Sequence, residues 1–459
     1  MDPNDLDGAD VQLSLLPQEG IDWSRARPPK RVWLEETRGD HAARLEFLAS
    51  QGLRLIMASP GPSEGGTLHF YNPRDRETLH LRAEGGRDLL PAASAFFPAA
   101  SRWMEMSRGR DREPPRDAEA SAWLVWGGCL VAVEAGRVVR VEEASAECPG
   151  APLRGTRAAQ ACAALEKGGG GEGVARAVSF ARACEEARGI KTPPAAEAVR
   201  ALLLESSRAR SHLAWLERAA LCLGRRRAAA ACRELRAGLE EAFTSWLGDP
   251  LGRGWVTPGG VSEEFPLEDA GGAAAALASI SASWRSMLER GLSLHAPRWM
   301  ERRLSALRER KEREAWTGPL ARALGVGTDA RAEEPGVYAL LDWEMVPEGV
   351  GGGVFQKLAA VKAREVSESL RVARRVLECP PARPLMARRG RGGRGEGFGR
   401  CEGPEGELCC HLAVEKGTVT FLALSLPGEI NRSGALVLEG RPLDEADLLF
   451  LPWNEIPSP

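Results

Sequence analysis

The segment of residues 195–223 constrains the fold of this chain more than any other part of the sequence. Its small and apolar residues recur every three or four positions: Ala198, Leu202, Ala209, Leu213 and Leu216. This spacing places them on one stripe of an α-helix of about eight turns. Pro193 and Pro194 precede the stripe and favour a helix start there. Because a stripe of this length needs other elements to bury it, the segment predicts a large, mainly helical domain.

Three other segments share this helical periodicity, namely 272–290, 298–314 and 355–378. Pro380 and Pro381 predict the end of the last helix. With 459 residues, the chain is also too long for one ordinary core, so two or three domains are expected.

The N-terminal part alternates between helical and strand patterns. Residues 41–52 predict a helix, and 53–59, 67–71 and 78–82 predict strands separated by turn residues. We therefore expect a small α+β domain over residues 31–110.

Composition marks the boundaries of this domain map. Residues 1–30 are polar and predict a flexible tail, and the charged segment 107–120 carries two prolines and predicts a linker. The large domain then covers 117–459 and contains an Arg/Gly-rich segment at 382–400, which predicts a flexible loop. Such tracts can bind RNA, but this one offers a single aromatic residue, Phe398, so a nucleic-acid partner is not expected.

Strand patterns also occur inside the large domain. Residues 124–141 predict a β-hairpin with its turn at 135–136, and 408–414, 419–426 and 435–438 predict strands near the C-terminus. The expected fold class is α+β and multidomain, with a small α+β domain followed by a mainly α-helical domain that carries peripheral β-hairpins.

Charge and hydropathy exclude several classes of partner. The net charge is -3, which gives no global attraction to nucleic acid or to an acidic membrane surface. No run approaches the roughly 20 apolar residues of a membrane helix. The first 20 residues lack the pattern of a signal peptide. We expect a cytoplasmic protein that reaches a membrane only through a partner.

The chain has 10 cysteines, and no two of them stand in a C-x-x-C spacing. Cys409 and Cys410 are adjacent and are open to two interpretations, a redox pair or two buried thiols. In a strand they would point to opposite faces, which favours buried thiols.

Two polar motifs stand out. Glu205, Arg208 and His212 follow the spacing i, i+3, i+7, which places them on one helix face. Taken alone, this pattern is typical of a solvated charged face with one structural histidine. The second motif, WTGPLARALGVGTDARAEEPGVY at 316–338, predicts a loop shaped by Gly and Pro in which Arg and Asp side chains pair.

These motifs, in this order, resemble the large subunit of group 4 energy-converting nickel–iron hydrogenases and the related hydrogenase-like subunit of complex I, the NADH:quinone oxidoreductase. Residues 96–105 (FFPAASRWME) resemble an element of the smaller complex I subunit that is often fused to it. The resemblance spans roughly residues 35–453. The residues that match the framework around the family's pocket are Arg154, Gly155, Glu205, Arg208, His212, Thr317, Gly318, Pro319, Arg322, Asp329 and Arg331.

Departures from the family decide the expected chemistry. A nickel–iron centre needs four thiolates from two C-x-x-C pairs, and glycine cannot replace soft sulfur ligands. Residues 167–173 (KGGGGEG) and the end of the chain carry no cysteine. Glu405 stands where the family has Arg. The complex I branch uses a His and a Tyr in its quinone pocket, and residues 116–180 contain neither.

The resemblance therefore implies a structural subunit of a membrane-associated respiratory or energy-converting redox complex, with no metal bound by this chain and no assignable catalytic residue. Iron–sulfur clusters are expected in a small-subunit partner, with membrane subunits in the same complex and a location at the inner face of the cell membrane. One alternative is a diverged subunit that still forms a pocket for a quinone or another electron acceptor. A second is a free-standing, non-redox binding protein.

Overall fold

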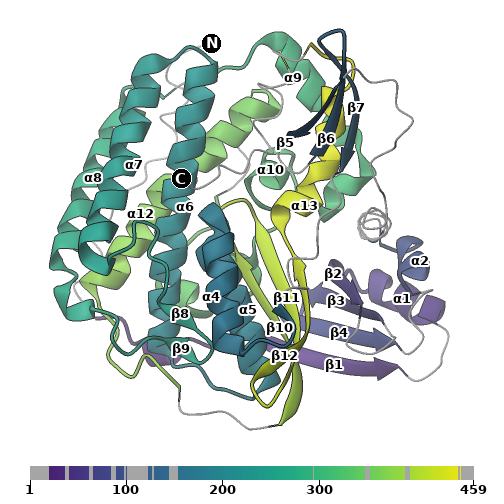
Figure 1. The fold of residues 1–459 in the computed structure, drawn as a ribbon, viewed down its shortest axis with the longest axis vertical. Helices are drawn as coiled ribbons and strands as arrows, with labels where there is room; N and C mark the ends of the chain where they lie inside the picture. Colours follow the sequence, from purple (N-terminus) through teal and green to yellow (C-terminus); the bar gives the residue numbers. More distant parts are fainter. Residues whose placement is uncertain are drawn as a thin grey trace.

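The computed structural model describes residues 20–442 and 445, apart from 37–40, 61–65, 84–88, 98–99, 101–121, 127–128, 144–152, 293, 347–351 and 388–392. The predicted linker and most of the 96–105 element lie outside the described residues. The division of the chain at the linker therefore stays a prediction. The described part combines helices with several small sheets, which confirms the α+β multidomain fold class (Figure 1). It contains no helix that is long and apolar enough to cross a membrane.

The N-terminal module is a four-stranded sheet with two helices. Its elements are β1 (Lys30–Glu36), α1 (His41–Ser50), β2 (Arg54–Pro60), β3 (Gly66–Asn72), β4 (Glu77–Ala83) and α2 (Leu89–Ser94). The strand order is β1-β4-β3-β2, with β1 parallel to β4 and the other pairs antiparallel. Helix α1 and strands β2 to β4 were predicted, whereas β1 was not.

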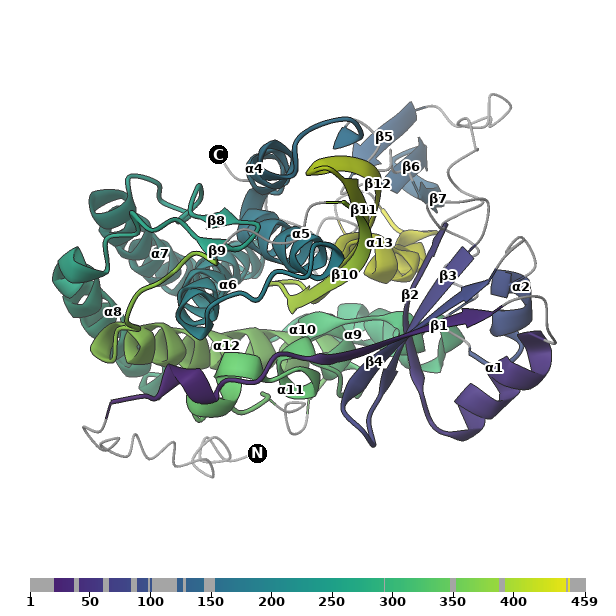
Figure 2. The ribbon, with the colours of Figure 1, turned by 90° about the horizontal axis from the view of Figure 1, so that it is seen from below.

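The chain enters this module along the helical domain. Figure 2 shows β1 running from beneath the helices into the sheet. Before it, the short 3-10 turn Trp23–Arg25 buries Trp23, whose indole N–H donates to the carbonyl oxygen of Cys379 at 3.1 Å. The prediction of a flexible tail is therefore wrong for residues 20–30, because one aromatic side chain provides enough apolar area to hold them.

The helical domain is built around α6. Its elements are α4 (Ala158–Gly168), α5 (Gly173–Ala187), α6 (Pro194–Cys222), α7 (Arg226–Leu247), α8 (Gly271–Glu289), α9 (Arg298–Ser305), α10 (Gly318–Ala323), α11 (Ala330–Glu333), α12 (Val354–Glu378) and α13 (Pro427–Asn431). Helix α6 packs against both α7 and α12. The predicted helices at 195–223, 272–290 and 355–378 are confirmed. The predicted helix at 298–314 ends early, because α9 gives way to the 3-10 turns Ala306–Glu309 and Lys311–Ala315.

Three further sheets complete the domain. They contain β5 (Ala122–Trp126), β6 (Cys129–Glu134) and β7 (Arg137–Glu143); β8 (Val256–Thr257) and β9 (Gly260–Val261); and β10 (Arg394–Glu402), β11 (Glu407–Glu415) and β12 (Thr418–Ser425). The turn predicted at 135–136 is confirmed, and both of its residues have positive φ. The strand predicted at 435–438 is wrong, since Arg432–Leu438 is a 3-10 helix.

The Arg/Gly-rich segment corrects another prediction, because 394–400 belong to the regular strand β10 and not to a loop. Strand β10 pairs with β11 in continuous register and lies against α5. Three glycines alternate along the strand toward the helix: Gly395, Gly397 and Gly399. A Cβ atom at any of them would overlap a backbone carbonyl oxygen of α5. The glycines thus allow helix and strand to touch backbone to backbone.

Candidate functional site

The centre of the candidate site is α6, which carries Glu205, Arg208 and His212. All three side chains are fully buried. Their partners come from α12, from α11 and from the turn after β10. The prediction that they share one face of a long buried helix is confirmed, and a solvated charged face is excluded.

Glu205 is the most heavily bonded carboxylate of the site. It accepts hydrogen bonds from Arg208 Nε at 3.1 Å, Arg331 Nη1 at 3.1 Å, the Tyr338 hydroxyl at 2.8 Å and the Ser369 hydroxyl at 2.7 Å. Burial alone would raise the pKa of Glu205, but the charges of Arg208 and Arg331 outweigh it and lower that pKa. Glu205 is therefore ionised at neutral pH.

Helices α10 and α11 and the loop between them supply the matching charges. Asp329 caps α11 by accepting the backbone N–H of Arg331 at 2.9 Å, and its carboxylate pairs with Arg322 at 2.7 Å and Arg331 at 2.8 Å. The same two arginines bind Glu365 Oε1 of α12 at 2.6 and 2.8 Å. The arginine charges outweigh burial and lower the pKa of both Asp329 and Glu365. The predicted Arg–Asp pairing is confirmed.

The T-G-P sequence fixes where α10 starts. Gly318 has φ +75, and a Cβ there would overlap the carbonyl oxygen of Glu405. The Thr317 hydroxyl accepts the backbone N–H of Glu407 at 2.8 Å, and Pro319 occupies the first turn of α10. Asn431 pairs with both backbone groups of Thr317 at 3.0 Å. Three separate segments are therefore joined at one point.

Lys362 completes the site and was missed from the sequence. It is fully buried on α12, and its Nζ contacts both carboxylate oxygens of Glu405 at 2.8 Å and His212 Nδ1 at 3.5 Å. His212 Nε2 bonds to Glu365 Oε2 at 2.7 Å. Burial, and then the charge of Lys362, lower the pKa of His212 to about 4, so its ring is neutral. The acidic side chain of Glu405, which departs from the family, thus has its own buried cation.

These charged groups form what we call the buried ion network. Its four cations are Arg208, Arg322, Arg331 and Lys362, and its five carboxyl groups are Glu205, Asp329, Glu365, Glu402 and Glu405. Burial, and then the nearby charge of Asp329, raise the pKa of Glu402 to about 8. With Glu402 protonated, four cations face four carboxylates, so the network is electrically balanced at neutral pH.

The network predicts a specific pH dependence. The folded carboxyl of Glu402 ionises near pH 8 and the unfolded one near its ordinary value of 4.5. Its contribution to stability is therefore complete below about pH 4.5 and is lost as the pH rises to about 8, by up to about 1.4 kcal/mol per pH unit. We expect Glu402→Gln to remove this slope from the free energy of unfolding, measured by urea denaturation across the range. The exposed Glu344→Gln serves as the control and should leave the slope unchanged.

A second buried ion group holds the neighbouring turn. Arg200 of α6 pairs with Glu185 at 2.5 Å and Glu197 at 2.6 Å, and it donates to the carbonyl oxygens of Thr257 and Gly260 at 3.0 Å each. This group explains why residues 257–261, which form the turn of β8 and β9, are fixed against α6.

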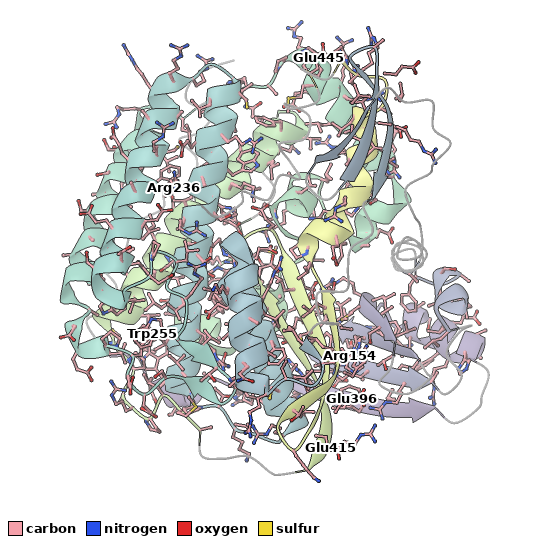
Figure 3. All side chains as sticks on the ribbon, viewed as in Figure 1. Arg154, Arg236, Trp255, Glu396, Glu415 and Glu445 are labelled. Carbon is pink, nitrogen blue, oxygen red and sulfur yellow. The ribbon has the colours of Figure 1, made fainter. Side chains whose placement is uncertain are left out.

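Arg154 and Gly155 are not part of the network. Both lie beside β12, where Arg154 stacks over the Phe421 ring at 5.6 Å and the Gly155 N–H donates to Val419 at 2.8 Å (Figure 3). The structure thus brings together most of the predicted framework residues and leaves these two outside.

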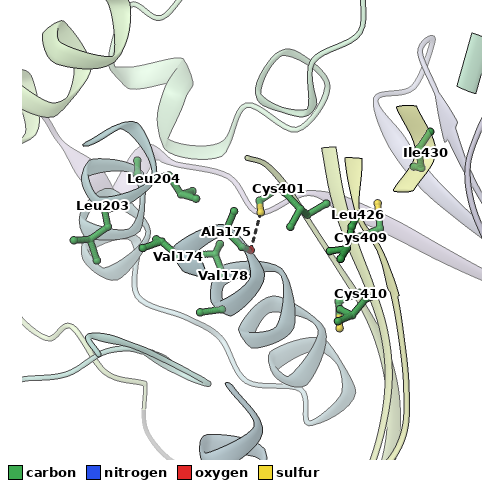
Figure 4. Close-up of a cluster of buried hydrophobic side chains, with 14 of the residues drawn as sticks. Val174, Ala175, Val178, Leu203, Leu204, Cys401, Cys409, Cys410, Leu426 and Ile430 are labelled. Carbon is green, nitrogen blue, oxygen red and sulfur yellow. Dashed lines mark hydrogen bonds between the residues drawn. The ribbon is translucent and has the colours of Figure 1, made fainter. Parts of the chain in front are cut away.

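The described cysteines do not fit a nickel centre. Cys401 donates to the carbonyl oxygen of Ala175 at 3.1 Å, and burial raises its pKa to about 12 (Figure 4). Burial also raises the pKa of Cys409 and Cys410, which lie in the core on β11. Protonated thiols are poor ligands. Within the described part of the chain, no cluster of three or more His, Cys, Asp or Glu side chains could hold a metal ion.

Comparison with solved structures defines the class of fold. The chain matches one chain of the membrane-bound sulfane sulfur reductase, an archaeal respiratory membrane complex, with a TM-score of 0.58 and 18% identity. The match covers 74% of this chain and 95% of that one. At this identity, the match establishes the fold alone.

Sequence comparison then gives a family match over part of the chain. Residues 223–393 match the family described as respiratory-chain NADH dehydrogenase, 49 Kd subunit. An NADH-quinone oxidoreductase subunit of Desulfitobacterium hafniense is 29% identical over 52% of this chain and 66% of its own length. The corresponding subunit of Chlorobaculum parvum is 36% identical over 22% of this chain and 28% of its own length. The chain thus spans less than two thirds of these relatives. Over this part of its length the chain is similar to the 49 kDa subunit of complex I, as its motifs predicted.

Proposed function

We propose that this chain is a hydrogenase-like large subunit of a membrane-associated respiratory or energy-converting redox complex, and that its role there is structural. The buried ion network carries this proposal. Its charged side chains fix α6, α12 and the loops around α10 and β10, while the sequence lacks the thiolates that a nickel–iron centre needs.

Burying these charges costs free energy, and the cost is understandable if the loops that carry them must keep one arrangement. Each buried charge loses several kcal/mol of hydration, which well-made ion pairs only offset. A network of this kind therefore adds little net stability, and its main effect is to hold the loops in one arrangement. We infer that the arrangement serves a surface on which a partner subunit packs.

The partner that fits the family is a small iron–sulfur subunit, joined by membrane subunits of the same complex. This chain would then lie at the inner face of the cell membrane without crossing it. It would bind no cofactor of its own, and the iron–sulfur clusters would belong to the partner.

The second candidate function is a diverged pocket for a quinone or another electron acceptor. One observation favours it. Glu405 is 17% exposed, whereas Lys362 and His212 behind it are fully buried. This chain of polar groups joins a partly accessible carboxylate to the network and places charged groups at one point of the surface, where an acceptor could bind.

The proposal predicts the composition of the purified complex. A tagged chain, isolated from its native cells, should carry an iron–sulfur subunit and membrane subunits in fixed ratio, with iron but without stoichiometric nickel by elemental analysis. One nickel per chain would contradict the structural role. A monodisperse monomer without partners would favour a free-standing binding protein.

The two candidates differ in one activity. If the complex reduces a soluble quinone, and Lys362→Met abolishes that reduction while the subunits still co-purify, the acceptor pocket is supported. The exposed Lys167→Met, on α4, is the matched control. A complex whose quinone reduction is unchanged in Lys362→Met would exclude the pocket and leave the structural role.

A further inference from the structure

A cluster of histidines lies where the N-terminal module meets the β10–β12 sheet. His69 of β3, His80 of β4 and His411 of β11 are fully buried there. Trp33 packs on the His80 ring at 4.3 Å, and Phe398 stacks on the His69 ring at 4.3 Å. Three of the six histidines of the chain are thus enclosed in one interface.

A continuous chain of hydrogen bonds joins these groups. His80 Nδ1 lies 2.7 Å from His69 Nδ1, and His69 Nε2 lies 3.3 Å from the Ser59 hydroxyl. The Ser59 hydroxyl lies 2.6 Å from His411 Nδ1, and His411 Nε2 lies 2.6 Å from Glu396 Oε1. Glu396 is on β10 (Figure 3) and His411 is on β11, so the chain of bonds crosses from the module into the large domain.

The two ends of the chain fix the direction of its bonds. Glu396 only accepts, so His411 donates to it from Nε2. At the other end, His80 Nε2 is buried and has no hydrogen-bond partner among the described residues. An N–H there would lack an acceptor, so His80 carries its proton on Nδ1 and donates it to His69 Nδ1. His69 then donates from Nε2 to the Ser59 hydroxyl, and the rings of His69 and His80 each hold one proton and are neutral.

The surrounding charges oppose a further proton. The cations Arg31 of β1 and Arg82 of β4 lie near the His69 and His80 rings. The anions at the site are Glu396, which binds Arg82 and His411, and Glu186 of α5, which binds Arg31 at 2.6 Å and Trp33 at 2.7 Å. Burial, and then neighbouring positive charge, hold the pKa of His69 and His80 well below the ordinary range.

We propose that the cluster of His69, His80 and His411 is an acid-sensitive lock that holds the N-terminal module on the large domain. In the closed interface the rings of His69 and His80 are neutral and bonded to each other, and Ser59 joins them to His411. When the module separates, the rings reach water and bind protons readily. Mild acid therefore favours the open form, independently of any redox role of the chain.

Several carboxylates of the interface do not titrate in this pH range. Thr78 donates to Glu334 at 2.7 Å, and Arg54 pairs with Glu407 at 3.1 Å. The pKa values of Glu334, Glu396 and Glu407 are lowered, because ion pairs and hydrogen bonds outweigh burial. These carboxylates stay ionised while histidines titrate.

The sign and size of the effect follow from linkage. A histidine whose pKa is depressed in the closed form stabilises that form fully above about pH 6.5, and this contribution is lost as the pH falls. Each proton taken up on opening shifts the equilibrium about tenfold per pH unit. With His69 and His80 both taking up a proton, the closed form should weaken by up to about 100-fold per unit below pH 6.5.

Hydrogen exchange of the full chain tests the lock. Backbone exchange, corrected for intrinsic rates, should rise in β3, β4 and β11 between about pH 7.5 and pH 5.5, while α6 remains protected. The double variant His69→Gln, His80→Phe keeps a donor for Ser59 and a ring for Trp33, and it should lose this acid response. His41→Gln, on α1 of the same module, is the matched control and should keep it.

Three results would overturn the proposal. These are equal protection of the wild-type interface at both pH values, an unchanged acid response in the double variant, and loss of the response in His41→Gln. If the double variant does not fold, exchange of the imidazole C–H of each wild-type histidine gives its pKa directly. Ordinary titration of His69 and His80 near pH 6.5 with the interface still protected would also overturn it.

Discussion

Replacing Arg331 by methionine is expected to cost about 3–5 kcal/mol of folding free energy, because it leaves buried carboxylates without their cation. Arg331 binds Glu205, Asp329 and Glu365 at 2.8 to 3.2 Å. Each of these three carboxylate residues is at most 2% exposed. A loss of this size approaches the total stability of many domains. The measurement is the urea midpoint of the purified chain, or its soluble yield where the variant does not fold.

Arg374→Met is the matched control, since Arg374 is partly exposed on α12 and pairs with Glu378 at 2.9 Å. Exposed pairs of this kind contribute about 0.2–1 kcal/mol. A similar loss in the two variants would show that the network adds no more than a surface ion pair.

Gly399→Ala is expected to separate α5 from β10. The new Cβ would overlap the carbonyl oxygen of Ser179 and approach the backbone nitrogen of Ala183, and backbone atoms cannot rotate away as side chains do. Helix and strand would have to move apart, which opens the core around Cys401 and Val178. We expect a loss of more than about 3 kcal/mol, in the upper range for overpacked cores.

Gly168→Ala provides the comparison, because a Cβ there has no atom within 4 Å and the residue ends α4. Alanine favours helix over glycine by up to about 1 kcal/mol, so this variant should be neutral or slightly more stable. Thermal unfolding of both variants gives the result. Equal melting temperatures would mean that the backbone contact between α5 and β10 is loose.

The long helices could be predicted because each buries a continuous stripe. The ends of α6, α8 and α12 lie within one residue of the predicted ends. Their periodicity reflects one requirement, the burial of one helix face, and residues close together in the sequence are enough to show it. Strand β1 had no such signal, since its sequence KRVWLEE is charged at both ends and its partner β4 lies far along the chain.

The abundance of glycine explains why a loop was predicted at 382–400, where part of the segment is a strand. In 382–400, abundant Gly and Arg suggested a loop, although glycine on every second residue also fits a strand pressed against a helix. Composition alone does not distinguish these cases, because only the neighbouring backbone shows why a side chain is excluded.

The site was predictable only within single segments. The spacing of Glu205, Arg208 and His212 is visible in the sequence, and so is the Arg322–Asp329 motif. Lys362 was missed because its partners, His212 and Glu405, are remote in sequence and meet it only in the folded chain. The family departure at Glu405 was a signal that a compensating cation should exist.

The contacts of the N-terminal module also bear on how the chain folds during synthesis. Trp23 bonds to Cys379, 356 residues later, and Ser59 bonds to His411, 352 residues later. At ribosomal rates of about 5–20 residues per second, these partners emerge about 20 to 70 seconds after the first strands. Until then, the face that carries His69 and His80 has nothing to cover it. This face is thus covered only late in synthesis, and faster translation of the helical domain would shorten the time in which it can pair prematurely.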